Sequence, residues 1–245
     1  MTKDEVLGRK SRPSEVTVAE GSKFIGAVFL YMFLALLITG IVAVGLGFLF
    51  EKLLFTTDPG TFNQAYAITL IVSLVLYIPM MIIVQVSAIR NSKAMIPCYV
   101  LYSIIMGVLI STFTNFIPFF EIAIAFGGTC LAFGLMTLIA WFSKRNVGKL
   151  AIIGSGLLFG SLMLVFINLI LGLFGVVIEP LLWVIQFIML IAVILITIFD
   201  LRNIKEIADR GGAGTNVALM CALSLYVDFI YIFIRILALI ARLKR

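Results

Sequence analysis

The chain has 245 residues and a net charge of +6, and 63% of its residues are apolar whereas 12% are charged. Soluble domains are about 45–50% apolar and about 25% charged, so this composition excludes a soluble protein and indicates an integral membrane protein. Because each span takes about 20 residues, no room remains for a soluble catalytic domain, and basic loops rather than nucleic-acid binding explain the positive charge.

Seven apolar stretches are long enough to cross a bilayer as helices, because a hydrocarbon core about 30 Å thick needs about 20 helical residues. They cover residues 24–50, 65–89, 94–114, 118–143, 150–178, 181–200 and 217–241. We therefore predict an all-α membrane protein with seven transmembrane helices in one domain, residues 24–241. Residues 1–23 are expected to form a polar cytoplasmic tail that is not a cleavable signal, and residues 242–245 a short basic tail.

Basic residues lie in alternate connections, and this pattern predicts the orientation of the helices. They are Lys3, Arg9, Lys10, Arg12 and Lys23 before the first span, Arg90 and Lys93 after the second, Lys144, Arg145 and Lys149 after the fourth, and Arg202, Lys205 and Arg210 after the sixth. The other connections contain only Lys52. Lys and Arg near helix ends are retained in the cytoplasm, so the N-terminus is expected inside. Arg242 and Arg245 would then lie outside, so the last stretch is either a seventh span, which its length favours, or a re-entrant segment returning to the cytoplasm.

Cysteine and histidine usage predicts neither a disulfide nor a cofactor. The chain has no His, and Cys98, Cys130 and Cys221 all lie within apolar spans, where each is most simply a small buried side chain. Zinc and other soft-ligand metal sites therefore have little support. Carboxylate and carbonyl oxygens could still bind a hard cation.

Small residues predict where the helices pack closely. Lipid provides no hydrophobic reason for helices to associate, so close approach depends on residues without bulky side chains. The pairs Gly156 and Gly160, and Gly128 and Ala132, have this spacing. We expect them to serve packing rather than conduction.

Asp200 and Asp228 are the feature that points to function, because they lie in the last two apolar stretches. A carboxylate within a bilayer is expensive to maintain and marks a functional site by default. Asp200 ends its stretch at the cytoplasmic side, so the two can meet only if the sixth helix continues past it. The segment up to Gly211–Gly212 permits that extension, and the glycine pair is the expected stop.

Polar residues near each aspartate share a helical face at 100° per residue. On the sixth helix they are Gln186, Thr197 and Asp200, and on the seventh they are Ser224, Asp228, Tyr231 and Arg235. Two such stripes on consecutive antiparallel helices could face each other and line a polar seam. For Ser224, Thr197 and Gln186 the alternative stays open that each only fixes helix packing. Arg90 lies at a matching level, either as a partner of the aspartates or as an ordinary interfacial arginine.

Several motifs in residues 24–241 resemble the Bax inhibitor-1-like family, also called the transmembrane Bax-inhibitor-motif family, in its short prokaryotic form. The most specific is Ala222-Leu-Ser-Leu-Tyr-Val-Asp-Phe-Ile230, which is similar to the last-helix motif of the family. The others are Phe199-Asp-Leu-Arg-Asn-Ile-Lys205, Ala125-Phe-Gly-Gly-Thr129 with Phe142-Ser-Lys-Arg145, Phe166-Ile-Asn-Leu169 around Asn168, and Ile89-Arg-Asn-Ser-Lys-Ala94.

The resemblance implies a seven-helix bundle with the last helix near its centre and a pH-sensitive calcium leak, in the plasma membrane of a bacterium. It also implies that Asp200 and Asp228 form a di-aspartyl sensor, transiently contacting calcium, and that Arg90 can pair with one of them. Ser224, Tyr231, Arg235, Thr197, Gln186 and Asn168 are then the candidate pore-lining residues. The chain departs from the family pattern at Tyr231, where Asn is common, and at Arg235, which stands about one turn before a family arginine. Calcium ions, protons and the lipid bilayer are the expected partners, and the sequence identifies no protein partner.

A physical mechanism accompanies the resemblance. Two carboxylates at hydrogen-bond distance share one proton and titrate as a coupled unit, so protonation decides whether they tie the two helices together or release one aspartate to Arg90.

An enzyme is not expected. An intramembrane aspartyl protease also places one Asp on each of two adjacent helices, but Asp228 follows Leu-Tyr-Val rather than a glycine-flanked sequence. The remaining alternatives are a proton-coupled small-solute transporter and a non-conducting membrane regulatory protein. Internal repeats would favour a transporter, and the spans show none.

Overall fold

The computed structural model describes residues 15–56, 59–90, 94–114, 117–142, 148–175 and 178–243. Within them the chain forms α2 (Glu15–Thr56), α3 (Pro59–Ile89), α4 (Met95–Thr114), α5 (Phe119–Phe142), α6 (Gly148–Leu173), α7 (Glu179–Asp209) and α8 (Thr215–Leu243). Each of these helices contains a stretch long and apolar enough to cross a membrane. The predicted fold class, an all-α membrane protein with seven spans, is confirmed.

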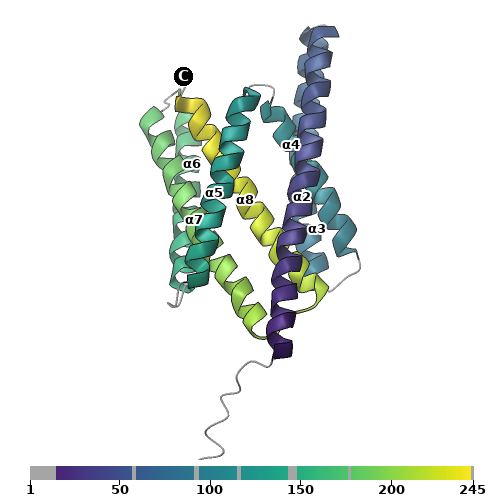
Figure 1. Ribbon diagram of the computed structural model, residues 1–245. Coiled ribbons are helices and arrows are strands. Elements are labelled where there is room, and N and C mark those ends of the chain that lie inside the picture. Colours follow the sequence, from purple (N-terminus) through teal and green to yellow (C-terminus); the bar gives the residue numbers. More distant parts are fainter. Residues whose placement is uncertain are drawn as a thin grey trace, which may run out of the picture.

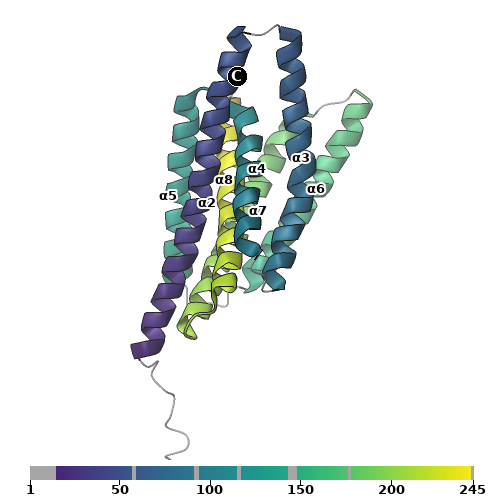
Figure 2. The ribbon, with the colours of Figure 1, turned by 90° about the vertical axis from the view of Figure 1, so that its right-hand side faces the viewer.

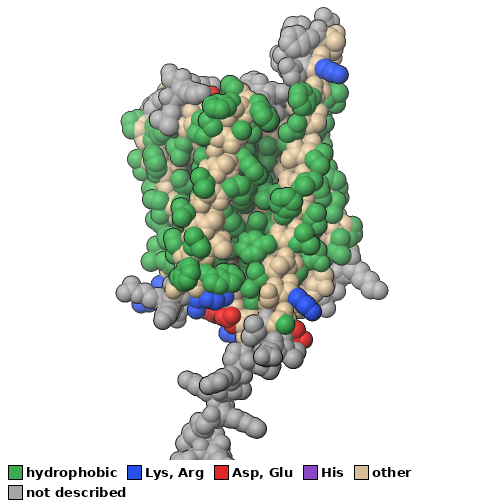
Figure 3. Space-filling model, in the orientation of Figure 1, with side chains coloured by type: hydrophobic (Ala, Val, Ile, Leu, Met, Phe, Trp, Pro, Cys, Tyr) green, Lys and Arg blue, Asp and Glu red, His purple; other side chains and the backbone are tan. Residues whose placement is uncertain are grey.

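The helices form one bundle, with the beginning of α2 at one end and the end of α8 at the other (Figure 1). We call these the N-terminal end and the far end. Figure 3 shows a belt of apolar side chains, with most of the visible basic side chains below it at the N-terminal end. Exposed Ile71, Leu131 and Phe159 contribute to the apolar surface, as expected of helices that face lipid.

Several basic residues behind the predicted orientation lie outside the described part of the chain. They are Lys3, Arg9, Lys10, Arg12, Lys93, Lys144, Arg145, Lys244 and Arg245. Among the described ones, Lys23, Arg90, Lys149 and Arg210 lie near helix termini at the N-terminal end, and Lys52 lies near the opposite terminus of α2. The alternation of charge therefore corresponds to the two ends of the bundle.

α8 lies at the centre of the bundle and runs obliquely between the other helices (Figures 1 and 2). It packs mainly against α2, α3, α4, α5 and α7, whereas α6 packs on α7. In its most apolar window 56% of the residues are buried, compared with 11% in α6. Because α8 is one uninterrupted helix that reaches the far end, the last apolar stretch is a full span and not a re-entrant segment.

Aromatic rings fill the space between α8 and its neighbours. Phe126 of α5 lies edge-on to Phe229 and Phe233 of α8, with ring centroids 5.7 and 6.4 Å apart. On another side of α8, Tyr226 lies edge-on to Tyr102 of α4 at 6.0 Å. These contacts fix the rotation of α8, and so they decide which of its faces is turned towards α7.

α7 continues beyond Asp200 to Asp209, as the sequence predicts. It ends where the backbone N–H of Gly212 donates to the carbonyl oxygen of Ile207 at 3.0 Å. Gly211 and Gly212 have positive φ angles of 101° and 80°, a conformation that glycine adopts without a steric penalty. The extension places Asp200 nine residues before the end of the helix, or about 14 Å inside it at 1.5 Å per residue.

Several predicted boundaries differ from the structure. α2 ends at Thr56 rather than at residue 50, and α3 begins at Pro59 rather than at residue 65. α2 begins at Glu15, within the predicted polar tail, because residues 15–23 contain no proline that would stop a helix. α6 ends at Leu173 rather than near residue 178, because Gly175 adopts a φ of 78°. The residues after it are still apolar, so hydropathy alone did not indicate the end of this helix.

The predicted packing role of Gly156 and Gly160 is wrong. A Cβ atom added at either glycine would meet nothing within 4 Å, so both lie away from neighbouring helices. Gly154 has this role instead, because its Cβ would lie 2.8 Å from Cγ1 of Ile196 on α7. At Gly128 a Cβ would make only an ordinary contact, 3.9 Å from Ile236. Small residues show where close approach is possible, but not which face meets a neighbour.

Candidate functional site

α7 and α8 are consecutive helices that pack against each other and are joined by a short turn at the N-terminal end. Their polar residues meet at three levels along this contact. We call this set the seam, formed by Gln186, Thr197 and Asp200 of α7 and by Ser224, Asp228 and Arg235 of α8. Except for Tyr231, the two stripes predicted from helical spacing therefore face each other.

The level nearest the N-terminal end joins Asp200 to Ser224. The Ser224 hydroxyl donates a hydrogen bond to Oδ2 of Asp200. Cys221, one turn before Ser224, lies within electrostatic range of the same carboxylate. The hydrogen bond fixes the orientation of Asp200 towards α8, although Asp200 itself is only partly buried.

The middle level contains Asp228, which is 9% exposed. Asp200 lies within electrostatic range of its carboxyl group, and Thr197 lies within hydrogen-bonding reach of it. In the described part of the chain, Oδ2 of Asp228 is buried without a hydrogen-bond partner. Buried polar groups are nearly always satisfied, so such an oxygen calls for a proton, a water molecule or an ion.

The level nearest the far end joins the two helices through Arg235 and Gln186. Nη1 of Arg235 donates to Oε1 of Gln186 at 2.6 Å. Gln186 lies seven residues after the first residue of α7, about 10 Å inside that helix. The seam thus carries negative groups towards the N-terminal end and a positive group towards the far end.

Three other predicted site residues lie outside the seam. Tyr231 is 42% exposed and lies within electrostatic range of Tyr77 on α3 and of Arg235. Asn168 is on α6, which packs on α7, and its Nδ2 is buried without a partner among the described residues. Arg90 is exposed in the turn after α3, and within the described chain it makes no ion pair with either aspartate.

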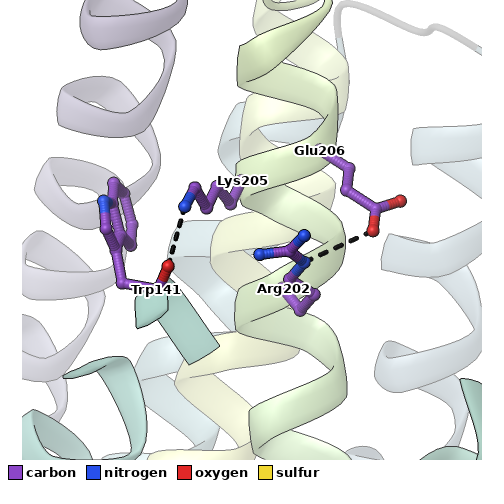
Figure 4. Close-up of polar contacts among 4 residues, drawn as sticks. All are labelled: Trp141, Arg202, Lys205 and Glu206. Atoms are coloured by element: carbon purple, nitrogen blue, oxygen red, sulfur yellow. Dashed lines mark hydrogen bonds and ion pairs between the residues drawn. The ribbon is translucent and has the colours of Figure 1, made fainter. Parts of the chain in front are cut away.

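The extension of α7 beyond the seam is attached to α5 by Lys205 (Figure 4). Its Nζ donates to the backbone carbonyl of Trp141 at 2.8 Å and lies 5.3 Å from the centroid of the Trp141 ring. A cation at the last turn of a helix stabilises its free carbonyl groups. Figure 4 also shows the ion pair of Arg202 and Glu206 at 3.4 Å, which is exposed and contributes little to stability.

A second polar cluster, which sequence reasoning missed, joins α8 to α2 and α4. The hydroxyl groups of Thr39 and Tyr226 are 2.7 Å apart, and Thr39 also donates to the carbonyl oxygen of Ser103 at 3.0 Å. All three residues are buried. Tyr226 belongs to the last-helix motif, so the sequence did mark this residue. It did not indicate which helices pack against the face of α8 that carries Tyr226.

The seam offers two carboxyl groups, which are the kind of oxygen ligand that protons and hard cations take. The described residues contain no group of three or more His, Cys, Asp or Glu side chains placed to hold a metal ion. Calcium normally takes six to eight oxygen ligands. Backbone and amide carbonyl oxygens and water can supply some of these ligands, so a transient calcium contact at Asp200 and Asp228 stays a prediction.

Comparison with known proteins gives a family match and a relative. The sequence model of the family described as "Inhibitor of apoptosis-promoting Bax1" matches residues 21–245, which include six of the seven candidate spans of the described chain completely and the first span from its third residue onwards. An uncharacterized protein, YrjE, of Lactococcus lactis subsp. lactis (strain IL1403) is 29% identical over 167 residues, covering 66% of this chain and 69% of that protein. No solved structure gives a significant match.

Proposed function

The chain belongs to the Bax inhibitor-1-like family, and from this premise we propose that it is a cation leak channel whose calcium flux depends on pH. The gate is the proton shared by Asp200 and Asp228. One observation supports this assignment above all others. Asp228 is buried beside Asp200 inside the membrane-spanning bundle, and one of its carboxyl oxygens has no partner among the described residues.

The gate follows from the coupled ionisation of two nearby carboxyl groups. With one proton present, a small movement of the two side chains would form a carboxyl-carboxylate hydrogen bond that ties α7 to α8, whereas in this structure Oδ2 of Asp228 has no partner among the described residues. Loss of that proton leaves two negative charges in a poorly solvated place, where they repel each other and attract a cation. Ser224 orients Asp200, Thr197 lies within hydrogen-bonding reach of Asp228, and Cys221 is a further titratable side chain close to them.

The experiment that tests this function measures calcium entry into liposomes containing the purified wild-type chain. Calcium outside is held constant, and the pH is varied in small steps across the acidic and neutral range. We expect a flux above that of protein-free liposomes, which changes through a sigmoidal step as the shared proton is lost. A flux equal to that of protein-free liposomes at every pH would contradict the proposal and would favour a transporter or a non-conducting regulatory protein.

Arg90 is proposed as the partner of an aspartate released from the pair. In this structure it is exposed at the N-terminal end of the bundle, so it takes part only after α7 and α8 separate. Arg90→Ala is expected to shift the midpoint of the pH profile to higher pH by up to about one unit, because a nearby cation favours an ionised carboxylate. Lys52→Ala removes a positive charge at the far end and should leave the midpoint unchanged. An equal midpoint in Arg90→Ala and wild type would remove Arg90 from the mechanism.

We also propose that the N-terminal end faces the cytoplasm and that the protein lies in the plasma membrane of a bacterium. The basic residues at that end support this orientation. In a variant lacking Cys98, Cys130 and Cys221, a cysteine in place of Lys52 should react with an impermeant thiol reagent in intact cells. A cysteine in place of Arg210 should react only after permeabilisation. The opposite labelling pattern would invert the topology.

A further inference from the structure

Arg235 places a permanent positive charge inside α8, and the shared-proton gate does not use it. The residue lies eight positions before the end of the helix, or about 12 Å inside it at 1.5 Å per residue. A guanidinium group remains protonated under physiological conditions. Because a charge within a membrane-spanning helix is expensive to maintain, its presence indicates a functional role.

Gln186 holds this charge in place without neutralising it. The Arg235 guanidinium donates to the Gln186 amide oxygen at 2.6 Å, and among the described side chains no carboxylate lies within ion-pair distance of it. An amide is neutral, so the hydrogen bond orients the group while the full charge remains. An arginine that served only to tie two helices would be stabilised better by a carboxylate partner.

The position of Arg235 relative to the aspartates defines what its charge acts on. It lies seven residues after Asp228 on the same stripe of α8, which corresponds to about 10 Å along the axis. Arg235 is only partly buried, and Tyr231 between the two levels is 42% exposed. A cation that moves from the aspartate pair along this face towards the far end must pass the guanidinium group.

We propose that Arg235 is a selectivity-determining residue, an electrostatic barrier that slows cations in the far half of the seam and slows divalent cations most. Repulsion is proportional to the charge of the ion, so calcium meets twice the barrier that potassium meets at the same distance. This inference rests on the proposed cation leak and adds an ion preference to it. The protein then provides a pathway for cations along the seam, in which the aspartates attract cations and Arg235 limits their passage.

The test compares calcium and potassium flux in liposomes containing the wild type, Arg235→Gln or Arg235→Lys. Arg235→Gln should raise calcium flux on the order of tenfold and potassium flux about threefold, because the two barriers differ by a factor of two in energy. Arg235→Lys keeps the charge and should retain the wild-type ratio of the two fluxes. Lys149 is an exposed residue at the start of α6, at the N-terminal end of the bundle. Lys149→Gln removes one positive charge there and should leave both fluxes unchanged.

The outcomes separate this inference from the proposed function. An equal rise in both ions, or the same rise in Arg235→Lys, would show that the substitution loosens the seam, and would overturn the barrier. A wild type that conducts neither ion contradicts the proposed leak, yet supports the barrier if Arg235→Gln then conducts. If Arg235→Gln keeps the wild-type fluxes, or if neither protein conducts, the barrier is overturned. The elution volume in size-exclusion chromatography verifies that each variant is folded.

Discussion

Asp228→Asn is expected to abolish most of the pH dependence of calcium flux while leaving the bundle folded. Asn has nearly the same size as Asp and retains hydrogen-bonding capacity, but it cannot release a proton. Because the two carboxyl groups titrate as one unit, Asp200→Asn should have the same consequence. The measurement is calcium entry into liposomes over the same pH series for the wild type and both variants.

Glu206→Gln is the matched control for these variants. Glu206 lies on α7 as Asp200 does, but it is exposed and paired with Arg202 outside the seam. Neutralising it should leave the pH profile of the wild type intact. If both aspartate variants kept the wild-type profile, the shared proton could not be the gate.

Gly21→Ala is expected to destabilise the bundle by about 1–3 kcal/mol, because it adds a methyl group where two helices already touch. A Cβ atom at Gly21 of α2 would overlap the carbonyl oxygen of Ala208 on α7 and lie 3.0 Å from its carbonyl carbon. Both atoms belong to the backbone, so no flexible side chain can move aside. The measurement is the thermal denaturation temperature of the purified protein in detergent.

Gly26→Ala provides the matched control on the same helix. A Cβ atom at Gly26 would meet nothing within 4 Å. Alanine is favoured over glycine inside a helix by roughly 0.5–1 kcal/mol, so this variant should be as stable as the wild type or slightly more so. A Gly21→Ala protein that denatured at the temperature of Gly26→Ala would contradict the close crossing of α2 and α7.

Helical spacing predicted the residues of the seam because they repeat with the period of a helix, but it also placed Tyr231 there, which lies outside the seam. Asp200 and Ser224 are 24 residues apart, and a single turn joins the two helices that carry them. Two antiparallel helices joined by a short turn pack side by side. Once a polar stripe was assigned to each helix, the arrangement in which the two stripes face each other was therefore the natural expectation. The glycine pair after Asp209 also predicted where α7 ends, because the end of a helix is determined by local backbone conformation.

Contacts between distant segments could not be predicted in the same way. Lys205 binds the backbone of Trp141 across 64 residues, and Tyr226 meets Thr39 across 187 residues. Such contacts depend on how all the helices are rotated about their axes, and apolar sequences that face lipid on one side and protein on the other show little difference between these faces. The same uncertainty explains why Gly156 was chosen for packing although Gly154 makes the contact.

The most direct test of the account is to follow the protonated carboxyl group itself. Infrared difference spectra of the wild-type protein in liposomes, recorded across the pH series, should show a carboxylic-acid band that disappears over the pH range in which calcium flux changes. The pH at which this band disappears should change in Asp200→Asn and in Asp228→Asn, because each variant leaves a single carboxyl group that no longer shares a proton, and it should stay unchanged in Glu206→Gln. A band that titrates at a different pH from the flux, or whose titration is the same in both aspartate variants as in the wild type, would contradict a gate made of one proton shared by Asp200 and Asp228.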